Sequence, residues 1–339
     1  MDFRFDDEQI ALRDAIRAVG ERHFSLDTVG TREGVHIADA TWSTLSDMGV
    51  FAMLLPADVG GIGGGVVEAA LIFEQLGAHL ATGPLRWSAA ASPLLVRSIG
   101  EGYAAGAMRI AGLDATSSMT PHVIEHALES DLIVVLHDDR VERCAPNTFD
   151  LTAGTPLDPL TPAAFCTTLP QGELIGDAAD AQQLRAVGAI LATAELVGVA
   201  QGALTVAAAY AKERQQFGVP IGSFQAVKHL LADMFVRVEL ARSTLYAAAA
   251  IFDDPRAGDL ALAISSAKLL AGEAGIMNGK TAVQILGGMG FTWEMLPHYF
   301  LKRAWVLEES FGTADTHALA LSDALAAGLS SRADIGEVA

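Results

Sequence analysis

The sequence is poor in cysteine, in aromatic residues and in basic residues. Only two of its 339 residues are cysteines, Cys144 and Cys166, which is too few for a disulfide framework or a metal site, so we expect no bound metal. Aromatic residues make up 6% and hydrophobic residues 51%, which indicates an aliphatic core of closely packed helices. Lysine and arginine number 22 against 41 acidic residues, a formal charge of −19. This acidity excludes nucleic-acid binding and argues against an anionic membrane surface.

Nothing in the first residues suggests secretion. Met1–Glu8 has neither a basic region nor an apolar region, so we expect a cytoplasmic protein. Val187–Ala209 is apolar enough to raise the question of a membrane span, but Glu195 and Gln201 interrupt it. A helix inside a bundle explains it at least as well, and we predict no membrane insertion. Glu195 would then need an ion-pair partner.

The first part of the chain, residues 1–106, has the pattern of a helical domain. Apolar residues recur at helical spacing over residues 6–23, 39–48 and 66–80. The glycine-rich stretch Gly60–Gly65 lacks the strand and the lysine of nucleotide-binding loops, so a flexible connector is predicted there.

Short strands replace helices between residues 107 and 176. Leu132–Leu136 and Val141–Cys144 flank a polar turn and predict a hairpin. Phe149–Leu151 and Ala164–Leu169 are further strand candidates. Prolines recur at 146, 156, 159, 162 and 170, which suits short strands better than helices. We predict a small, reduced β domain.

The last part of the chain, residues 177–330, predicts long helices over residues 180–214, 223–253 and 258–289. Helices of this length with short connections are typical of an antiparallel four-helix-type bundle. Residues 331–339 are expected to form a tail. The predicted fold class is therefore α+β and mostly helical.

The turn between the first two long helices carries a distinctive motif. From Arg214 to Gln225 the sequence reads R-Q-Q-F-G-V-P-I-G-S-F-Q, in which glycine and proline interrupt the helix. Ser223 is expected to cap the next helix through its hydroxyl. On spacing alone, Arg214 is a solvated arginine at a helix end.

This motif and a second one, Q-I-L-G-G-M-G from Gln284 to Gly290, together resemble the acyl-CoA dehydrogenase family. On its own, the second motif is a helix C-cap and turn. The resemblance implies FAD as cofactor, with Arg214 and Gln225 reaching the ADP half of a neighbouring subunit's FAD. The cofactor-binding residues that it implies are Arg214, Phe217, Phe224, Gln225, Gln284, Ile285, Leu286, Gly287, Gly288, Thr313 and Asp315.

The resemblance fails where the family holds the flavin ring and the catalytic base. The family's T-E-P-x-x-G-S-D stretch is not matched by Gly112–Met119, and no tryptophan follows Trp87 until Trp293. The family's Y-E-G-T-S-E-I motif reads S-F-G-T-A-D-T here, so Phe311 replaces the glutamate that removes the α-proton. Some relatives carry the base on the first bundle helix, and that position is Gly188.

Three carboxylates near Phe311 could act as a displaced base, and none is assigned. Helix geometry turns Glu308 and Glu309 away from the Phe311 position, and Asp315 has the shorter reach. No catalytic residue is therefore predicted.

The resemblance implies FAD-dependent α,β-desaturation of an acyl-CoA in fatty-acid or steroid degradation. We expect this chain to be the base-lacking subunit of a hetero-oligomer whose partner is a full-length acyl-CoA dehydrogenase, with an electron-transfer flavoprotein as a candidate electron acceptor. Two other interpretations stay open. The chain could be a self-sufficient, homo-oligomeric flavoenzyme with a displaced base or a monooxygenase activity, or a scaffold without activity. The sequence does not identify the acyl group.

Overall fold

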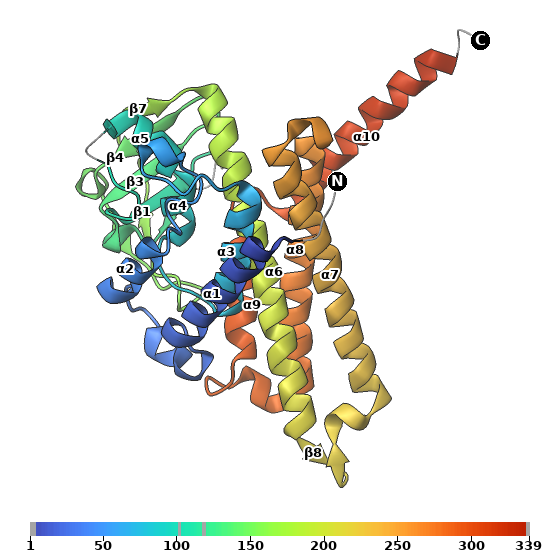
Figure 1. The fold of residues 1–339 in the computed structure, drawn as a ribbon. Helices are drawn as coiled ribbons and strands as arrows, with labels where there is room; N and C mark the ends of the chain where they lie inside the picture. The colour runs from blue at the N-terminus through green and yellow to red at the C-terminus, as the bar shows by residue number, and fades with distance from the viewer. Residues whose placement is uncertain (1–4, 101–102, 117–119, 337–339) are drawn as a thin grey trace.

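The structure, a computed structural model, describes residues 5–100, 103–116 and 120–336. Within these residues helices come first, short strands follow, and long helices complete the chain (Figure 1). This order confirms the predicted α+β, mostly helical fold class.

The N-terminal helices are α1 (Asp7–His23), α2 (Asp39–Asp47), α3 (Val66–Ala78), α4 (Leu85–Ala90) and α5 (Ser92–Ile99). α1 begins with a capping box, because the Asp6 carboxylate accepts from the Gln9 amide at 2.8 Å and the Gln9 side chain accepts from the Asp6 amide in return. The sequence did not predict α4. All six of its residues are buried, so it has no amphipathic period to detect.

The glycine-rich stretch before α3 is closely packed, and the predicted flexible connector is wrong. A Cβ at Gly61 would lie 2.0 Å from the carbonyl oxygen of Leu55, and one at Gly64 would lie 2.4 Å from Sδ of Met53. The Gly63 amide also donates to the Leu55 carbonyl at 2.8 Å. Glycine is needed here because the loop folds back onto its own backbone.

The central strands are β1 (Ile110–Asp114), β2 (His122–Glu125), β3 (Leu132–Leu136), β4 (Val141–Cys144), β5 (Thr152–Ala153), β6 (Ala163–Cys166) and β7 (Glu173–Gly176). One sheet has the order β1-β3-β4-β7 and a second has the order β2-β6-β5. β1 and β3 are parallel, and the other pairs within these two sheets are antiparallel. The predicted β3–β4 hairpin is confirmed, with Ile133 opposite Cys144.

The strand predicted at Phe149–Leu151 is absent, since the described strand begins at Thr152. A 3-10 turn, Pro146–Thr148, precedes Phe149, whose side chain is buried with those of Ile124 and Val135. Its apolar character reflects burial rather than strand pairing. The part of Gly112–Met119 from 117 onward lies outside the described residues.

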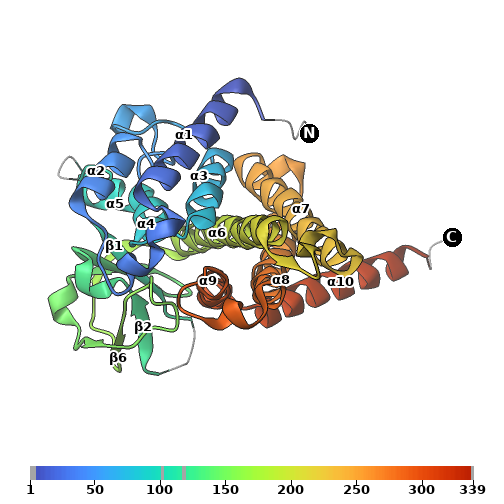
Figure 2. The same cartoon turned by 90° about the horizontal axis from the view of Figure 1, so that it is seen from below.

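The C-terminal helices are α6 (Ala178–Glu213), α7 (Gln225–Asp253), α8 (Leu260–Leu286), α9 (Pro297–Glu309) and α10 (Ala314–Gly336). Short connections make α6, α7 and α8 antiparallel. α6 lies between the N-terminal helices α1 and α3 on one side and α8 and α9 on the other (Figure 2). α10 packs against α8 at its start and then projects from the molecule (Figure 1).

One detail of the predicted bundle is wrong. The N-cap position of α7 is Phe224, and the Ser223 hydroxyl donates instead to the Pro220 carbonyl at 2.7 Å. α9 begins at Pro297, a favoured first helical residue. α10 continues through residues 331–336.

The long apolar helices pack within the molecule. The most apolar stretch of α6 is 89% buried, and that of the helix ending near Phe291 is 44% buried. α6 also meets α3 closely, since a Cβ at Gly198 would lie 2.0 Å from the Glu74 carbonyl oxygen and one at Gly77 would lie 2.3 Å from that of Glu195. Glycine on both helices therefore sets the position of the N-terminal domain against the bundle.

Candidate functional site

A crevice opens where the β domain meets the helices. It holds a cavity of about 220 Å³, lined by β1, β2, the start of α4 and the end of α9. The residues that matter for its chemistry are Arg86, Trp87, Gly112, Glu125, Glu309 and Phe311. This cavity contains the position at which the family resemblance places the catalytic base.

Phe311 fills the inner end of this crevice with its ring. The ring lies 4.9 Å from the Trp87 ring, centroid to centroid, and Phe311 is 5% exposed. A Cβ on Gly188 would lie 2.3 Å from the Phe311 ring. The two positions from which the resemblance expects a base are therefore in contact, and neither carries a carboxylate.

The three nearby carboxylates have different surroundings. Glu308 accepts from the Ala314 amide and so caps α10, whereas Asp315 is exposed and does not line the cavity. Glu309 does line it beside Phe311, which corrects the expectation that it points away. Burial and the neighbouring Glu308 carboxylate raise the pKa of Glu309.

A buried ion-pair cluster lies behind Phe311. Arg86 pairs with Glu195 of α6, and its guanidinium also lies 3.3 Å from Glu125 and donates to the Ser310 hydroxyl at 3.3 Å. Burial acts to lower the pKa of Arg86, but the two carboxylates outweigh it and the pKa is raised. The ion pair predicted for Glu195 is confirmed. Sequence reasoning missed Arg86, although an arginine inside the apolar stretch of α4 was a usable signal.

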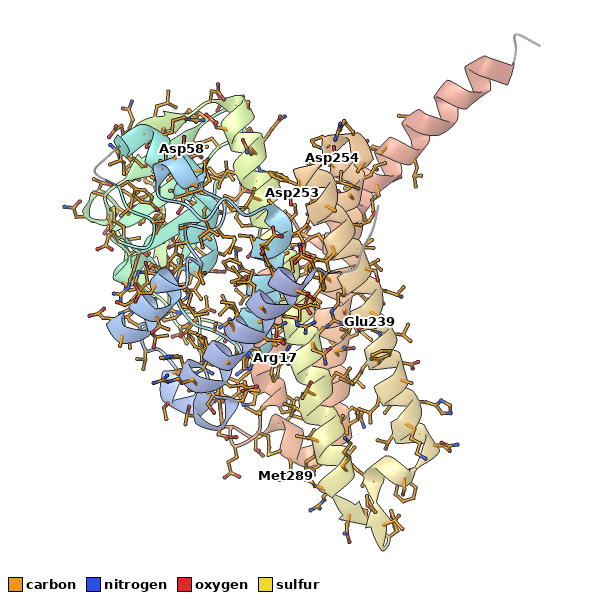
Figure 3. All side chains as sticks on the ribbon, in the orientation of Figure 1. Arg17, Asp58, Glu239, Asp253, Asp254 and Met289 are labelled. Carbon is orange, nitrogen blue, oxygen red and sulfur yellow. The ribbon has the colours of Figure 1, made fainter. Side chains whose placement is uncertain are left out.

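The second candidate region is the far end of the bundle, where the two sequence motifs meet solvent. Arg214, Gln225 and Gln284 are exposed, and in the described part of the chain their side chains have no hydrogen-bond or ion-pair partner. Met289, in the loop after α8, lies at the same end of the bundle as the hairpin after α6 (Figures 1 and 3).

The hairpin after α6 consists of β8 (Gln215–Gln216) and β9 (Val219–Pro220). Phe217 and Gly218 form its two-residue loop with φ of 54° and 79°, the backbone of a type I′ turn. A phenylalanine rarely adopts a positive φ, and its side chain is 92% exposed. The turn therefore presents an aromatic ring to solvent beside Phe224, which is 39% exposed.

The loop after α8 offers backbone to a ligand. Neither Gly287 nor Gly288 has an atom within 4 Å of the position a Cβ would occupy. Ile285 and Leu286, predicted to contact the cofactor, have side chains that are 8% and 3% exposed. Those two side chains belong to the core.

Thr313 and Asp315 lie apart from this end of the bundle, at the start of α10. The Thr313 hydroxyl accepts from the Thr316 amide at 3.2 Å, which makes it a helix cap. The structure thus divides the predicted cofactor residues between two places.

The length of α6 separates the two candidate regions. Phe311 contacts Gly188 near the start of α6, and Arg214 follows the end of the same helix, 26 residues further on. At 1.5 Å per residue this is roughly 39 Å. An extended FAD is shorter than that, so Arg214 cannot reach a cofactor whose flavin ring lies at the chain's own crevice.

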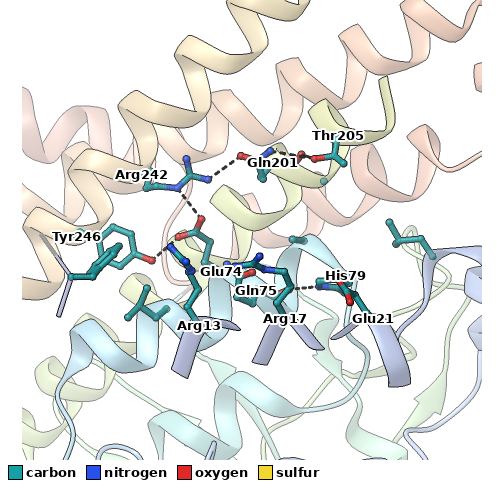
Figure 4. A pocket seen from close by; sticks show the side chains of 15 residues that line it. Arg13, Arg17, Glu21, Glu74, Gln75, His79, Gln201, Thr205, Arg242 and Tyr246 are labelled. Atoms are coloured by element: carbon teal, nitrogen blue, oxygen red, sulfur yellow. Dashed lines mark hydrogen bonds and ion pairs between the residues drawn. The ribbon is translucent and has the colours of Figure 1, made fainter. Parts of the chain in front are cut away.

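A larger cavity, about 640 Å³, lies between α1, α3, α6 and α7 (Figure 4). Its polar groups pair with one another: Arg242 donates to Glu74 at 2.9 Å and to Gln201 at 3.1 Å, and the Tyr246 hydroxyl donates to Glu74 at 2.6 Å. These bonds join the N-terminal domain to the bundle.

The thiols and the metal-binding side chains offer no further site in residues 5–100, 103–116 and 120–336. Both cysteines are buried free thiols there, and burial raises the pKa of Cys144 to about 11. No group of three or more histidine, cysteine or acidic side chains in these ranges could hold a metal ion.

Two family models match most of the chain. Residues 6–100 match the model described as acyl-CoA dehydrogenase, N-terminal domain, and residues 180–326 match acyl-CoA dehydrogenase, C-terminal domain. The chain is 31% identical to acyl-CoA dehydrogenase IpdE2 of Mycolicibacterium smegmatis over 88% of this chain and 92% of that protein. It is also 31% identical to acyl-CoA dehydrogenase FadE34 of Mycobacterium tuberculosis over 77% of this chain, but it spans only 38% of FadE34.

A solved structure supports the same fold. The chain is similar to the ChsE4–ChsE5 complex from Mycobacterium tuberculosis with a TM-score of 0.83 and 22% identity, covering 96% of this chain and 99% of the matched chain. At this identity the likeness establishes the fold.

Proposed function

The chain belongs to the acyl-CoA dehydrogenase family of oxidoreductases, and from this premise we propose that it is the base-lacking subunit of a hetero-oligomeric acyl-CoA dehydrogenase. In this role it completes the FAD site of a partner subunit, and the partner provides the flavin-ring pocket and the catalytic glutamate.

The observation that carries the proposal is the separation along α6. The polar side chains Arg214, Gln225 and Gln284 are free and exposed at one end of the bundle. The chain's own crevice lies roughly 39 Å away by helix rise. Because a single FAD cannot join them, a cofactor held by these residues belongs to another subunit.

The two regions differ in how well they fit FAD. At the bundle end, a guanidinium can bind a pyrophosphate through two parallel hydrogen bonds, two amides can bind ribose or adenine, and the open Gly287–Gly288 backbone allows close approach. At the crevice, the Trp87 ring packs over Gly112 of β1 and against the Phe311 ring, and these contacts reduce the space for a flavin ring. Bound FAD supplies a hydride acceptor, and this chain's share is to bind and orient its ADP half.

Several finer assignments follow from relatives. The ChsE4–ChsE5 complex, named for two different chains, supports a hetero-oligomeric assembly. The substrate is proposed to be an acyl-CoA from fatty-acid or steroid degradation, an electron-transfer flavoprotein is the proposed electron acceptor, and the proposed location is cytoplasmic.

The test is FAD occupancy of the complex between this chain and a full-length, glutamate-bearing family member. Losing a charge-assisted hydrogen bond costs about 1.5–3 kcal/mol, so Arg214→Ala should weaken FAD binding about tenfold to a hundredfold. Arg214→Lys should restore it only in part, because an ammonium lacks the guanidinium fork. Flavin absorbance per complex is the measurement, with a thermal melt of the subunit beside it.

The matched control is Arg256→Ala. Arg256 is also an exposed arginine, but it lies at the opposite end of α7, beside Asp254 (Figure 3). Its loss should leave flavin content unchanged. If Arg214→Ala also leaves flavin content and affinity unchanged, the partner-site role is wrong and the scaffold interpretation is the better one.

A second candidate function is a self-sufficient dehydrogenase in which Glu309 is the displaced base. The observation in its favour is that Glu309 lines the crevice beside Phe311 with a raised pKa. An assay of the isolated chain with several acyl-CoAs and an artificial electron acceptor separates the two functions. If the chain has no base, the isolated protein gives no appreciable turnover. Turnover that is abolished by Glu309→Gln supports Glu309 as the displaced base.

A further inference from the structure

Two aromatic rings meet two glycines at the inner end of the crevice. The Phe311 ring sits over Gly188, where a Cβ would come within 2.3 Å of it. The Trp87 ring sits over Gly112 of β1, where a Cβ would come within 2.1 Å. Each ring therefore occupies a notch that only glycine leaves open.

The two rings also pack against each other. Their planes are tilted by 39°, and the side chains are among the most buried of the cavity's lining, at 7% for Trp87 and 5% for Phe311. They come from α4 and from the turn after α9, and their notches are on β1 and α6. One aromatic contact thus joins the N-terminal domain, the β domain and the bundle.

Two buried side chains bind the backbone of the turn that carries Phe311. Phe311 has a φ of 57°, an unfavourable value for a side chain with a Cβ. His317 Nε2 donates to the Phe311 carbonyl at 3.2 Å, and Lys268 Nζ donates to the Gly312 carbonyl at 2.9 Å. Buried donors therefore hold the backbone that carries the ring, and the contact with Trp87 holds the ring itself.

The space that remains is small for an acyl-CoA thioester. A ligand pocket usually measures about 300–1,000 Å³. Here about 220 Å³ remains, and the wall also carries the charged side chains Arg86, Glu125 and Glu309.

We propose that Trp87 and Phe311 form an aromatic plug that excludes acyl-CoA thioesters from this chain's own crevice. The plug makes the crevice a rigid junction between three domains instead of a substrate site. This inference does not depend on the role of Arg214, because it concerns the opposite end of α6.

The test is binding of butyryl-CoA to the isolated chain by titration calorimetry. Phe311→Gly removes the ring and tolerates the positive φ, so it should bind butyryl-CoA at least about tenfold more tightly than the wild type. Phe311→Leu is the matched control, because its branched side chain still fills the notch, and it should bind no better than the wild type. Circular dichroism checks that each variant is folded, and Phe311→Ala replaces Phe311→Gly if the latter is not.

One result would overturn the plug: a folded Phe311→Gly or Phe311→Ala protein whose affinity for butyryl-CoA equals that of the wild type. Flavin content of the complex is measured separately, so the plug and the partner-site role of Arg214 can fail independently.

Discussion

Lys268 is a buried cation beneath the turn that carries Phe311. It is 1% exposed and donates to the backbone carbonyls of Glu308 and Gly312 at 2.7 and 2.9 Å. Burial lowers its pKa from 10.5 to about 7; the Glu308 charge opposes this shift and Arg86 adds to it. Between these two pH values the unfolded chain binds more protons than the folded chain. The free energy of unfolding therefore rises with pH across this window, and this stability is lost as the pH falls toward 7.

We expect the free energy of unfolding of the wild type to rise from about pH 7 toward pH 10.5 more steeply than that of Lys268→Met. The difference can reach about 1.4 kcal/mol per pH unit for one proton. Methionine keeps an unbranched side chain but cannot titrate. Urea unfolding of both proteins at several pH values is the measurement, and equal slopes would contradict the assignment.

Breaking the ion pair between Arg86 and Glu195 should have a large effect on the free energy of unfolding. Their side chains are 7% and 13% exposed, so Glu195→Gln leaves a buried guanidinium with Glu125 as its remaining charged partner. We expect a loss of about 3 kcal/mol in the free energy of unfolding. Asp254→Asn breaks an ion pair to Arg256, which is 90% exposed, and should leave stability nearly unchanged. Similar losses for both variants in urea unfolding would show that burial does not decide the strength of these pairs.

The contact between α3 and α6 depends on glycine. Alanine normally favours a helix interior over glycine by about 1 kcal/mol. A Cβ at Gly198 would nevertheless lie 2.0 Å from the Glu74 carbonyl oxygen, and a backbone atom cannot rotate away.

We therefore expect Gly198→Ala to destabilise the chain by about 1–3 kcal/mol, as overpacking does. The matched control is Gly272→Ala in α8, where the nearest atom is the side-chain Cγ of Glu308 at 3.3 Å and no backbone atom of another described element lies within 4 Å. That change should be neutral or stabilising. Thermal unfolding followed by circular dichroism distinguishes them, and a neutral Gly198→Ala would refute the close packing.

Across the whole molecule, the bundle end that carries the Arg214–Gln225 and Gln284–Gly290 motifs also exposes large apolar side chains. Phe217 is 92% exposed, Phe291 80% and Trp293 63%, although the chain has a charge of −19. Exposed apolar groups that gather in one place mark an interaction site.

We expect Phe217→Ser to weaken association with the partner subunit at least about tenfold, since aromatic residues supply much of the energy of an interface. Thermal stability of the chain alone should not change, because the ring makes few contacts within it. Val35→Ser, at an exposed apolar residue of the N-terminal domain, is the control and should not affect association. Sedimentation of the mixed subunits measures the affinity, and an unchanged affinity for Phe217→Ser would place the interface elsewhere.

Local patterns predicted most elements of the fold. α1, α3, α6 and the β3–β4 hairpin were read from periodicity, caps and turns, because each of these signals extends over only a few residues. α4 and the buried Phe149 were misread because burial on all sides removes periodicity. Ser223 was misassigned as a cap because its hydroxyl found a nearer acceptor in the Pro220 carbonyl.

The sequence by itself determined the family, the order of the three domains, and the lack of a carboxylate at both Phe311 and Gly188. Only the tertiary structure decided that these two residues touch, that Arg86 is the partner of Glu195 across 109 positions, and that Arg214 lies at the other end of α6 from the crevice. The reason is physical. Helix periods, caps and turn residues act within a few positions of the chain, whereas contacts between distant positions arise only when helices pack, and packing depends on all the side chains at the interface together.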